Sequence, residues 1–83
     1  MNVELYRRYL QEYVSEAIAN SDGSNKGIAS YLWEKKVTGF MVQHKTERER
    51  ALADARKAFD EHRHWPTQIV LSQLGVETKV PGE

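Results

Sequence analysis

Apolar side chains recur every three or four positions along most of this chain, which is the periodicity of helices that bury one face. The pattern is clearest in residues 2–20, where the polar positions fall together on the opposite face. Asn2 is placed to cap the first turn with its side-chain oxygen. We therefore expect a helix over residues 2–20, and its apolar stripe comprises Tyr6, Tyr9, Leu10, Tyr13, Val14, Ala17 and Ile18.

A cluster of small polar residues, SDGSNKG at positions 21–27, ends this helix and offers Ser24 or Asn25 as the start of the next. The apolar positions that follow predict a second helix over residues 25–44. We expect it to be either continuous or kinked near Gly39, since glycine costs about 1 kcal/mol inside a helix. Three consecutive apolar residues within 37–44 also fit a short buried strand. We prefer the helix, because a lone strand would have no partner.

Two further helices are predicted in the second half of the chain. Thr46 and Glu49 have the spacing of a capping box, and a narrow alanine-rich stripe follows, so we expect a helix over 46–63. Pro66 ends it and suits the first position of a helix over 66–74. Gly75 is the expected stop, followed by a frayed tail. The predicted fold is an all-α bundle of three to four helices in one domain, residues 1–83.

The composition describes a small domain with a lean core. The chain has 83 residues, no cysteine, 40% hydrophobic residues and a mean hydropathy of -0.70. It therefore buries only a modest apolar area and has no disulfide to reinforce it, so we expect a homodimer. No stretch approaches the ~18 apolar residues of a membrane span, and the first residues lack a signal-peptide pattern. We expect a cytoplasmic protein without membrane insertion.

Motifs for catalysis or cofactor binding are missing from the sequence. His44, His62 and His64 lack the spacing of a helical metal pair, and no HExxH occurs. No serine lies in a GxSxG elbow, and no glycine-rich phosphate loop is present. The carboxylates stand beside Lys or Arg at ordinary helical spacing. We expect no enzyme activity, no cofactor and no metal site.

The aromatic residues carry the functional hypothesis. In the simplest interpretation these rings only fill the core. We prefer a binding surface, because Tyr and Trp are enriched at interaction hot spots and we do not expect three tyrosine hydroxyls on one helix all to be sealed inside. The chain is then a protein-binding module that inhibits or modulates a partner, such as a phage or mobile-element accessory protein acting on a host protein. The predicted contact residues are Tyr6, Tyr9, Tyr13, Trp33 and Trp65.

A small DNA-binding transcriptional regulator is the alternative. Residues 26–45 contain four lysines and one acidic residue, and GIASYLWEKKVTG and IVLSQLGVETKV are weak helix-turn-helix matches. A DNA reader needs a recognition helix after its turn, whereas only seven residues follow Val76. The formal net charge of +0 also gives no overall attraction to phosphate. The lysines of this alternative are Lys26, Lys35, Lys36 and Lys45.

Overall fold

A computed structural model describes residues 1–37 and 43–77 of the chain. Within these ranges the secondary structure is four helices and no strand, which confirms the predicted all-α fold. The helices are α1 (Val3–Ala19), α2 (Asn25–Glu34), α3 (Lys45–Glu61) and α4 (Thr67–Leu74).

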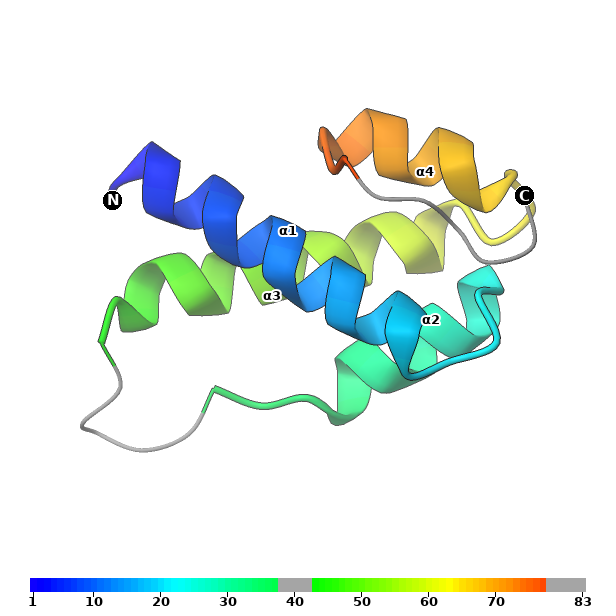
Figure 1. Ribbon diagram of the computed structural model, residues 1–83, viewed down its shortest axis with the longest axis horizontal. Helices are drawn as coiled ribbons and strands as arrows, with labels where there is room; N and C mark the ends of the chain where they lie inside the picture. Colours follow the sequence, from blue (N-terminus) through cyan, green and yellow to red (C-terminus); the bar gives the residue numbers. More distant parts are fainter. Residues whose placement is uncertain (38–42, 78–83) are drawn as a thin grey trace.

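The two long helices form the centre of the molecule (Figure 1). α1 crosses in front of α3, and both run from left to right in this view. α2 and α4 run back in the opposite direction, with α2 along the lower edge of the pair and α4 along the upper edge. Most contacts between helices join α1, α2 and α3, and α4 packs mainly on α3. In this arrangement the line along which α2 packs on α3 lies at the surface, and we call it the seam of α2 and α3.

The first two helices begin at the caps that the sequence predicts. The Asn2 side-chain oxygen accepts hydrogen bonds from the backbone N–H groups of Glu4 and Leu5, at 3.0 and 3.2 Å. The Ser24 hydroxyl accepts one from the N–H of Gly27 at 3.0 Å. These oxygens satisfy donors that have no partner inside the first helical turn.

The second helix is shorter than predicted. It ends at Glu34, and Lys35 is extended, with φ -70° and ψ 134°. The guanidinium of Arg56 on α3 donates from Nε to the Leu32 carbonyl at 2.8 Å and from Nη2 to the Lys35 carbonyl. Carbonyls that a longer helix would pair internally are thus satisfied by α3. The predicted helix is wrong for residues 35–37 and 43–44, while the kink at Gly39 and the strand alternative at 38–42 lie outside the described residues.

The predicted capping box of the third helix is also wrong. The helix begins at Lys45, one residue before Thr46, and its cap His44 is left-handed, with φ 57° and ψ 40°. No side-chain hydrogen bond caps this end. The His44 ring instead lies 2.8 Å from the Tyr9 hydroxyl, and Glu49 pairs with Lys45 at 3.6 Å. A tertiary contact of His44 and a local ion pair of Glu49 have thus replaced the capping box. The helix ends at Glu61 rather than at residue 63.

Gly75 stops the fourth helix, as the sequence predicts. Gly75 is left-handed, with φ 76°, and the N–H of Val76 reaches the Leu71 carbonyl at 3.0 Å. Val76 is buried, which supplies the apolar contact that accompanies such stops. Pro66 is the cap rather than the first helical residue. Val76 and Glu77 continue without helix, and the predicted frayed tail from residue 78 onward lies outside the described residues.

The core lies where α1, α2 and α3 meet, and α4 adds Val70 and Leu71 to it. Three alanines (Ala17, Ala51 and Ala55) are fully buried, and their small side chains let the two long helices approach closely. The largest fully buried side chains are Phe59, Ile28, Leu32, Leu71, Val14 and Val70. No helix within the described ranges has the length and apolar character needed to cross a membrane.

Candidate functional site

The predicted tyrosine stripe is not an exposed surface. Tyr9 and Tyr13 are only 6% and 7% exposed and belong to the core, so the expectation that they face a partner is corrected. Their hydroxyls do not remain unpaired inside. Tyr9 bonds with His44, Arg48 lies 4.1 Å above the Tyr9 ring, and Arg48 Nη1 is 3.5 Å from the Tyr13 hydroxyl. Polar groups at the start of α3 thus bind the tyrosine hydroxyls. The sequence of α1 by itself gives no sign of these partners.

Tyr6 is half-buried at the edge of the same stripe, and its hydroxyl donates to Asp54 Oδ2 at 2.5 Å. Burial, followed by this bond, raises the pKa of Tyr6 from 10.0 to about 12. The stabilisation due to Tyr6 is therefore complete below pH 10 and is lost as the pH rises towards 12. An ultraviolet absorbance titration should show late-ionising tyrosine, to which Tyr31 also contributes because its hydrogen bond with Glu16 raises its pKa, and Tyr6→Phe should remove the part nearest pH 12. Loss of absorbance change near pH 10 in the variant, with the part nearest pH 12 retained, would contradict this assignment.

Trp65 is exposed, but its ring contacts His62 in its own turn and its backbone contacts α2. Its indole stacks on the His62 ring with centroids 3.8 Å apart, and its carbonyl accepts a hydrogen bond from the Asn25 side chain at 2.6 Å. It is 40% exposed and lines neither of the hollows beside Trp33 described below. The five aromatic residues predicted from the sequence are therefore not one surface.

Trp33 is the more exposed of the two tryptophans, with 54% of its surface exposed against 40% for Trp65. It lies in the last turn of α2 and faces the polar side of α3. Its indole Nε1 donates to Asp60 Oδ2 at 2.8 Å, and the Arg56 guanidinium lies 4.9 Å from the ring centroid. Two contacts from a neighbouring helix thus fix the orientation of an exposed ring.

Arg56 joins this ring to the fold. The same guanidinium that contacts Trp33 also donates to the carbonyls at the end of α2. Its position therefore depends on the end of that helix, and it carries a positive charge that no carboxylate within 4.0 Å balances among the described residues. Trp33, Arg56 and Asp60 form a preorganised group across two helices.

Two open hollows flank Trp33, and we call them together the Trp33 surface. The first, of about 380 Å³, is lined by Trp33, Ala53, Arg56, Lys57, Asp60 and Glu61. The second, of about 500 Å³, is lined by Lys26, Ala29, Ser30, Trp33, Asp60 and Arg63. Because Trp33 and Asp60 belong to both, the indole stands as a ridge between two recesses along the seam of α2 and α3.

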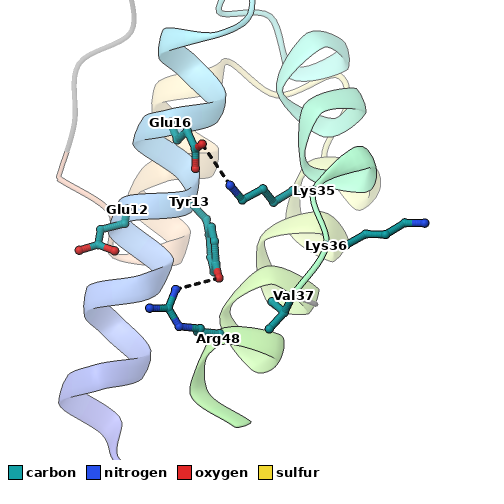
Figure 2. A pocket seen from close by; sticks show the side chains of 7 residues that line it. All are labelled: Glu12, Tyr13, Glu16, Lys35, Lys36, Val37 and Arg48. Atoms are coloured by element: carbon teal, nitrogen blue, oxygen red, sulfur yellow. Dashed lines mark hydrogen bonds and ion pairs between the residues drawn. The ribbon is translucent and has the colours of Figure 1, made fainter. Parts of the chain in front are cut away.

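A separate hollow of about 290 Å³ lies between α1 and the segment after α2 (Figure 2). Several of its polar groups are engaged with one another, because Lys35 Nζ is 3.1 Å from Glu16 Oε1 and Arg48 Nη1 donates to the Tyr13 hydroxyl at 3.5 Å. A hydrogen bond from Tyr31, followed by the contact with Lys35, lowers the pKa of Glu16, which keeps this carboxylate charged. The hollow is a polar seam between elements of the fold, and we do not choose it as the candidate site.

The four lysines of the DNA-binding alternative do not lie together on one surface. Lys35 pairs with Glu16 and Lys45 with Glu49. Lys36 points away from the polar hollow in Figure 2, and Lys26 lines the far end of the Trp33 surface. The local excess of lysine in the sequence therefore does not become one basic face in the described structure.

The sequence analysis did not identify several residues of the Trp33 surface as contact residues. Ala53, Arg56, Lys57 and Asp60 follow one another at intervals of three, one and three, so they share one face of a helix. That face looks like an ordinary solvated surface, because it is charged with both signs. Only the position of Trp33 on the neighbouring helix distinguishes it.

The described residues contain no group of three His, Cys, Asp or Glu side chains arranged to share a metal ion. Comparison of the chain with protein-family models, with curated proteins and with solved structures gave no match. The function proposed below is therefore inferred from the geometry of this chain.

Proposed function

We propose that this protein is a non-catalytic protein-binding module that modulates a protein partner through the Trp33 surface. The observation that carries the proposal is an exposed indole held in place by Asp60 and Arg56 between two recesses. Tryptophan and arginine are the residue types most enriched among interaction hot spots, where a ring fills or flanks a pocket.

The fixed orientation of Trp33 favours binding for an energetic reason. Association must offset the entropy lost when flexible side chains become ordered, at about 0.5–1.5 kcal/mol for each. Here the hydrogen bond to Asp60 and the contact with Arg56 already restrict the ring before a partner arrives. More of the contact energy is then available for affinity.

The carboxylates of this surface support a binding role over a catalytic one. Asp60 accepts from Trp33 and lies 3.7 Å from Arg63, and Glu61 lies 4.0 Å from Lys57. Such pairing occupies these carboxylates with partners in the fold, whereas a general acid or base needs access to a substrate.

Three finer parts of the proposal rest on size and composition alone. These are the homodimer, the cytoplasmic location, and the role as a phage or mobile-element accessory protein that inhibits a host protein. Sedimentation velocity over a concentration series addresses the first of these directly.

The direct test captures partners from cells that express the protein, using matched variants as bait. Trp33→Ser should lose a partner that the wild type retains, while Ile69→Ser, which removes a 47% exposed apolar residue on α4, should retain it. Trp33→Phe should retain part of the binding, because it preserves a ring. Equal capture by wild type and Trp33→Ser would contradict the proposal, and so would salt-sensitive DNA binding that Lys36→Glu abolishes.

A further inference from the structure

The Trp33 surface continues beyond its two hollows into a third. This third hollow, of about 360 Å³, is lined by Lys36, Val37, Glu49, Leu52 and Arg56. It shares Arg56 with the first hollow, as the first shares Trp33 and Asp60 with the second. Together the three form one groove along the seam of α2 and α3, with Lys26 near one end and Lys36 near the other.

The charges along this groove are unequal, although the chain as a whole has a formal net charge of +0. Five cationic side chains line it against three carboxylates. Each carboxylate already has a cation close by, since Glu49 lies 3.6 Å from Lys45, Asp60 3.7 Å from Arg63 and Glu61 4.0 Å from Lys57.

The remaining cations have no such partner. Within the described residues, no carboxylate lies within 4.0 Å of Lys26, Lys36 or Arg56. These three charges mark the two ends and the middle of the groove, and the Trp33 ring and the Ala29 and Ala53 side chains lie between them. The groove thus presents spaced, unneutralised positive charge around an aromatic ridge.

We propose that the groove binds an acidic segment of a partner protein that carries an apolar side chain. Its carboxylates pair with Lys26, Arg56 and Lys36, and its apolar side chain lies against Trp33. Complementary charge selects the partner and accelerates encounter, while the Trp33 ring, once the partner covers it, contributes most of the affinity. This inference rests on the proposed function and adds the chemistry of the partner.

A nucleic acid strand fits this groove less well. A strand carries phosphates at regular intervals, and its affinity depends on many cations following that path. Here Asp60 is bonded to the indole N–H, and Glu49 and Glu61 line the groove among the cations, so a phosphate chain would meet repulsion along its length. The carboxylates of a peptide can instead be spaced to meet only the three unpaired cations.

The experiment selects peptides from a random displayed library on the immobilised full chain, with Trp33→Ser as counter-selection. We expect the enriched peptides to combine Asp or Glu with a large apolar residue. A synthetic copy should lose at least about fivefold in affinity with Lys26→Glu or Lys36→Glu, and should weaken with added salt. Arg8→Glu, an exposed charge reversal on α1 outside the groove, should leave affinity unchanged. Circular dichroism verifies that each variant is folded.

The other outcomes distinguish a failure of this inference from a failure of the proposed protein-binding function. Peptides that need Trp33 but carry no acidic excess would overturn the acidic partner and leave the protein-binding function standing. Failure to select any Trp33-dependent peptide would overturn the inference, and the capture experiment would then decide the function alone. Tighter, Trp33-dependent binding of a single-stranded oligothymidylate, or a dimer that Lys36→Glu dissociates, would assign the groove to a different occupant.

Discussion

Phe59→Ala should lower the free energy of unfolding by about 3–5 kcal/mol, the largest effect expected from a single substitution in this chain. The Phe59 side chain is fully buried in the core. Truncation loses the transfer free energy of the ring and leaves a cavity that the surrounding helices fill only partly. Because the total free energy of unfolding of a protein domain is only about 5–15 kcal/mol, this variant should be close to unfolding.

Urea denaturation followed by circular dichroism measures this effect. Val3→Ala provides the matched control, because Val3 is 58% exposed and its truncation should change stability by less than about 0.5 kcal/mol. A loss below about 1 kcal/mol for Phe59→Ala would show that Phe59 is not at the centre of the core.

Asn25→Leu should destabilise the protein by about 2 kcal/mol, although it adds apolar area. Asn25 is the buried polar residue of the described core, at 7% exposure. Its Nδ2, which has two hydrogens to donate, lies within hydrogen-bond distance of three carbonyls, those of His62, Arg63 and Trp65, at 3.2, 3.3 and 2.6 Å, so one hydrogen is shared between two of them. Its Oδ1 accepts from the Thr67 hydroxyl at 2.6 Å. One side chain therefore ties the start of α2 to the turn between α3 and α4.

Leucine fills the space but removes the donor from the Arg63 and Trp65 carbonyls, and that desolvation is the main source of the cost. The His62 carbonyl keeps the Trp65 N–H, and the Thr67 hydroxyl keeps the Gly23 carbonyl. Asn20→Ala is the control, because Asn20 is exposed and donates to a carbonyl in its own helix, so its loss should cost less than about 0.5 kcal/mol. The intrinsic fluorescence of Trp65 should also change in Asn25→Leu. A variant as stable as the wild type would show that the turn is held by other contacts.

Local signals in the sequence predicted most of the fold. Apolar periodicity located all four helices, and Asn2, Ser24 and Gly75 fix their ends as expected, because caps and glycine stops act within a few residues. The failures come from contacts distant in sequence. α2 ends early where Arg56, more than twenty residues away, pairs with its last carbonyls, and the ring of His44 bonds with Tyr9.

The candidate site was predicted less completely for the same reason. Periodicity identified the face of α1 that carries three tyrosines, but whether that face is core or interface depends on which helix covers it. The start of α3 covers Tyr9 and Tyr13 and provides partners for their hydroxyls. Trp33 was among the predicted contacts, whereas Arg56 and Asp60 acquire their role only when α3 lies beside α2.

The equilibrium affinity of wild type and Trp33→Ser for a captured partner, measured by titration calorimetry, tests the central claim most directly. The account predicts a loss of at least about thirtyfold, which corresponds to about 2 kcal/mol, with the thermal unfolding midpoint almost unchanged. An affinity unchanged by Trp33→Ser, or a loss that only accompanies unfolding, would contradict the claim that the Trp33 surface is the binding site.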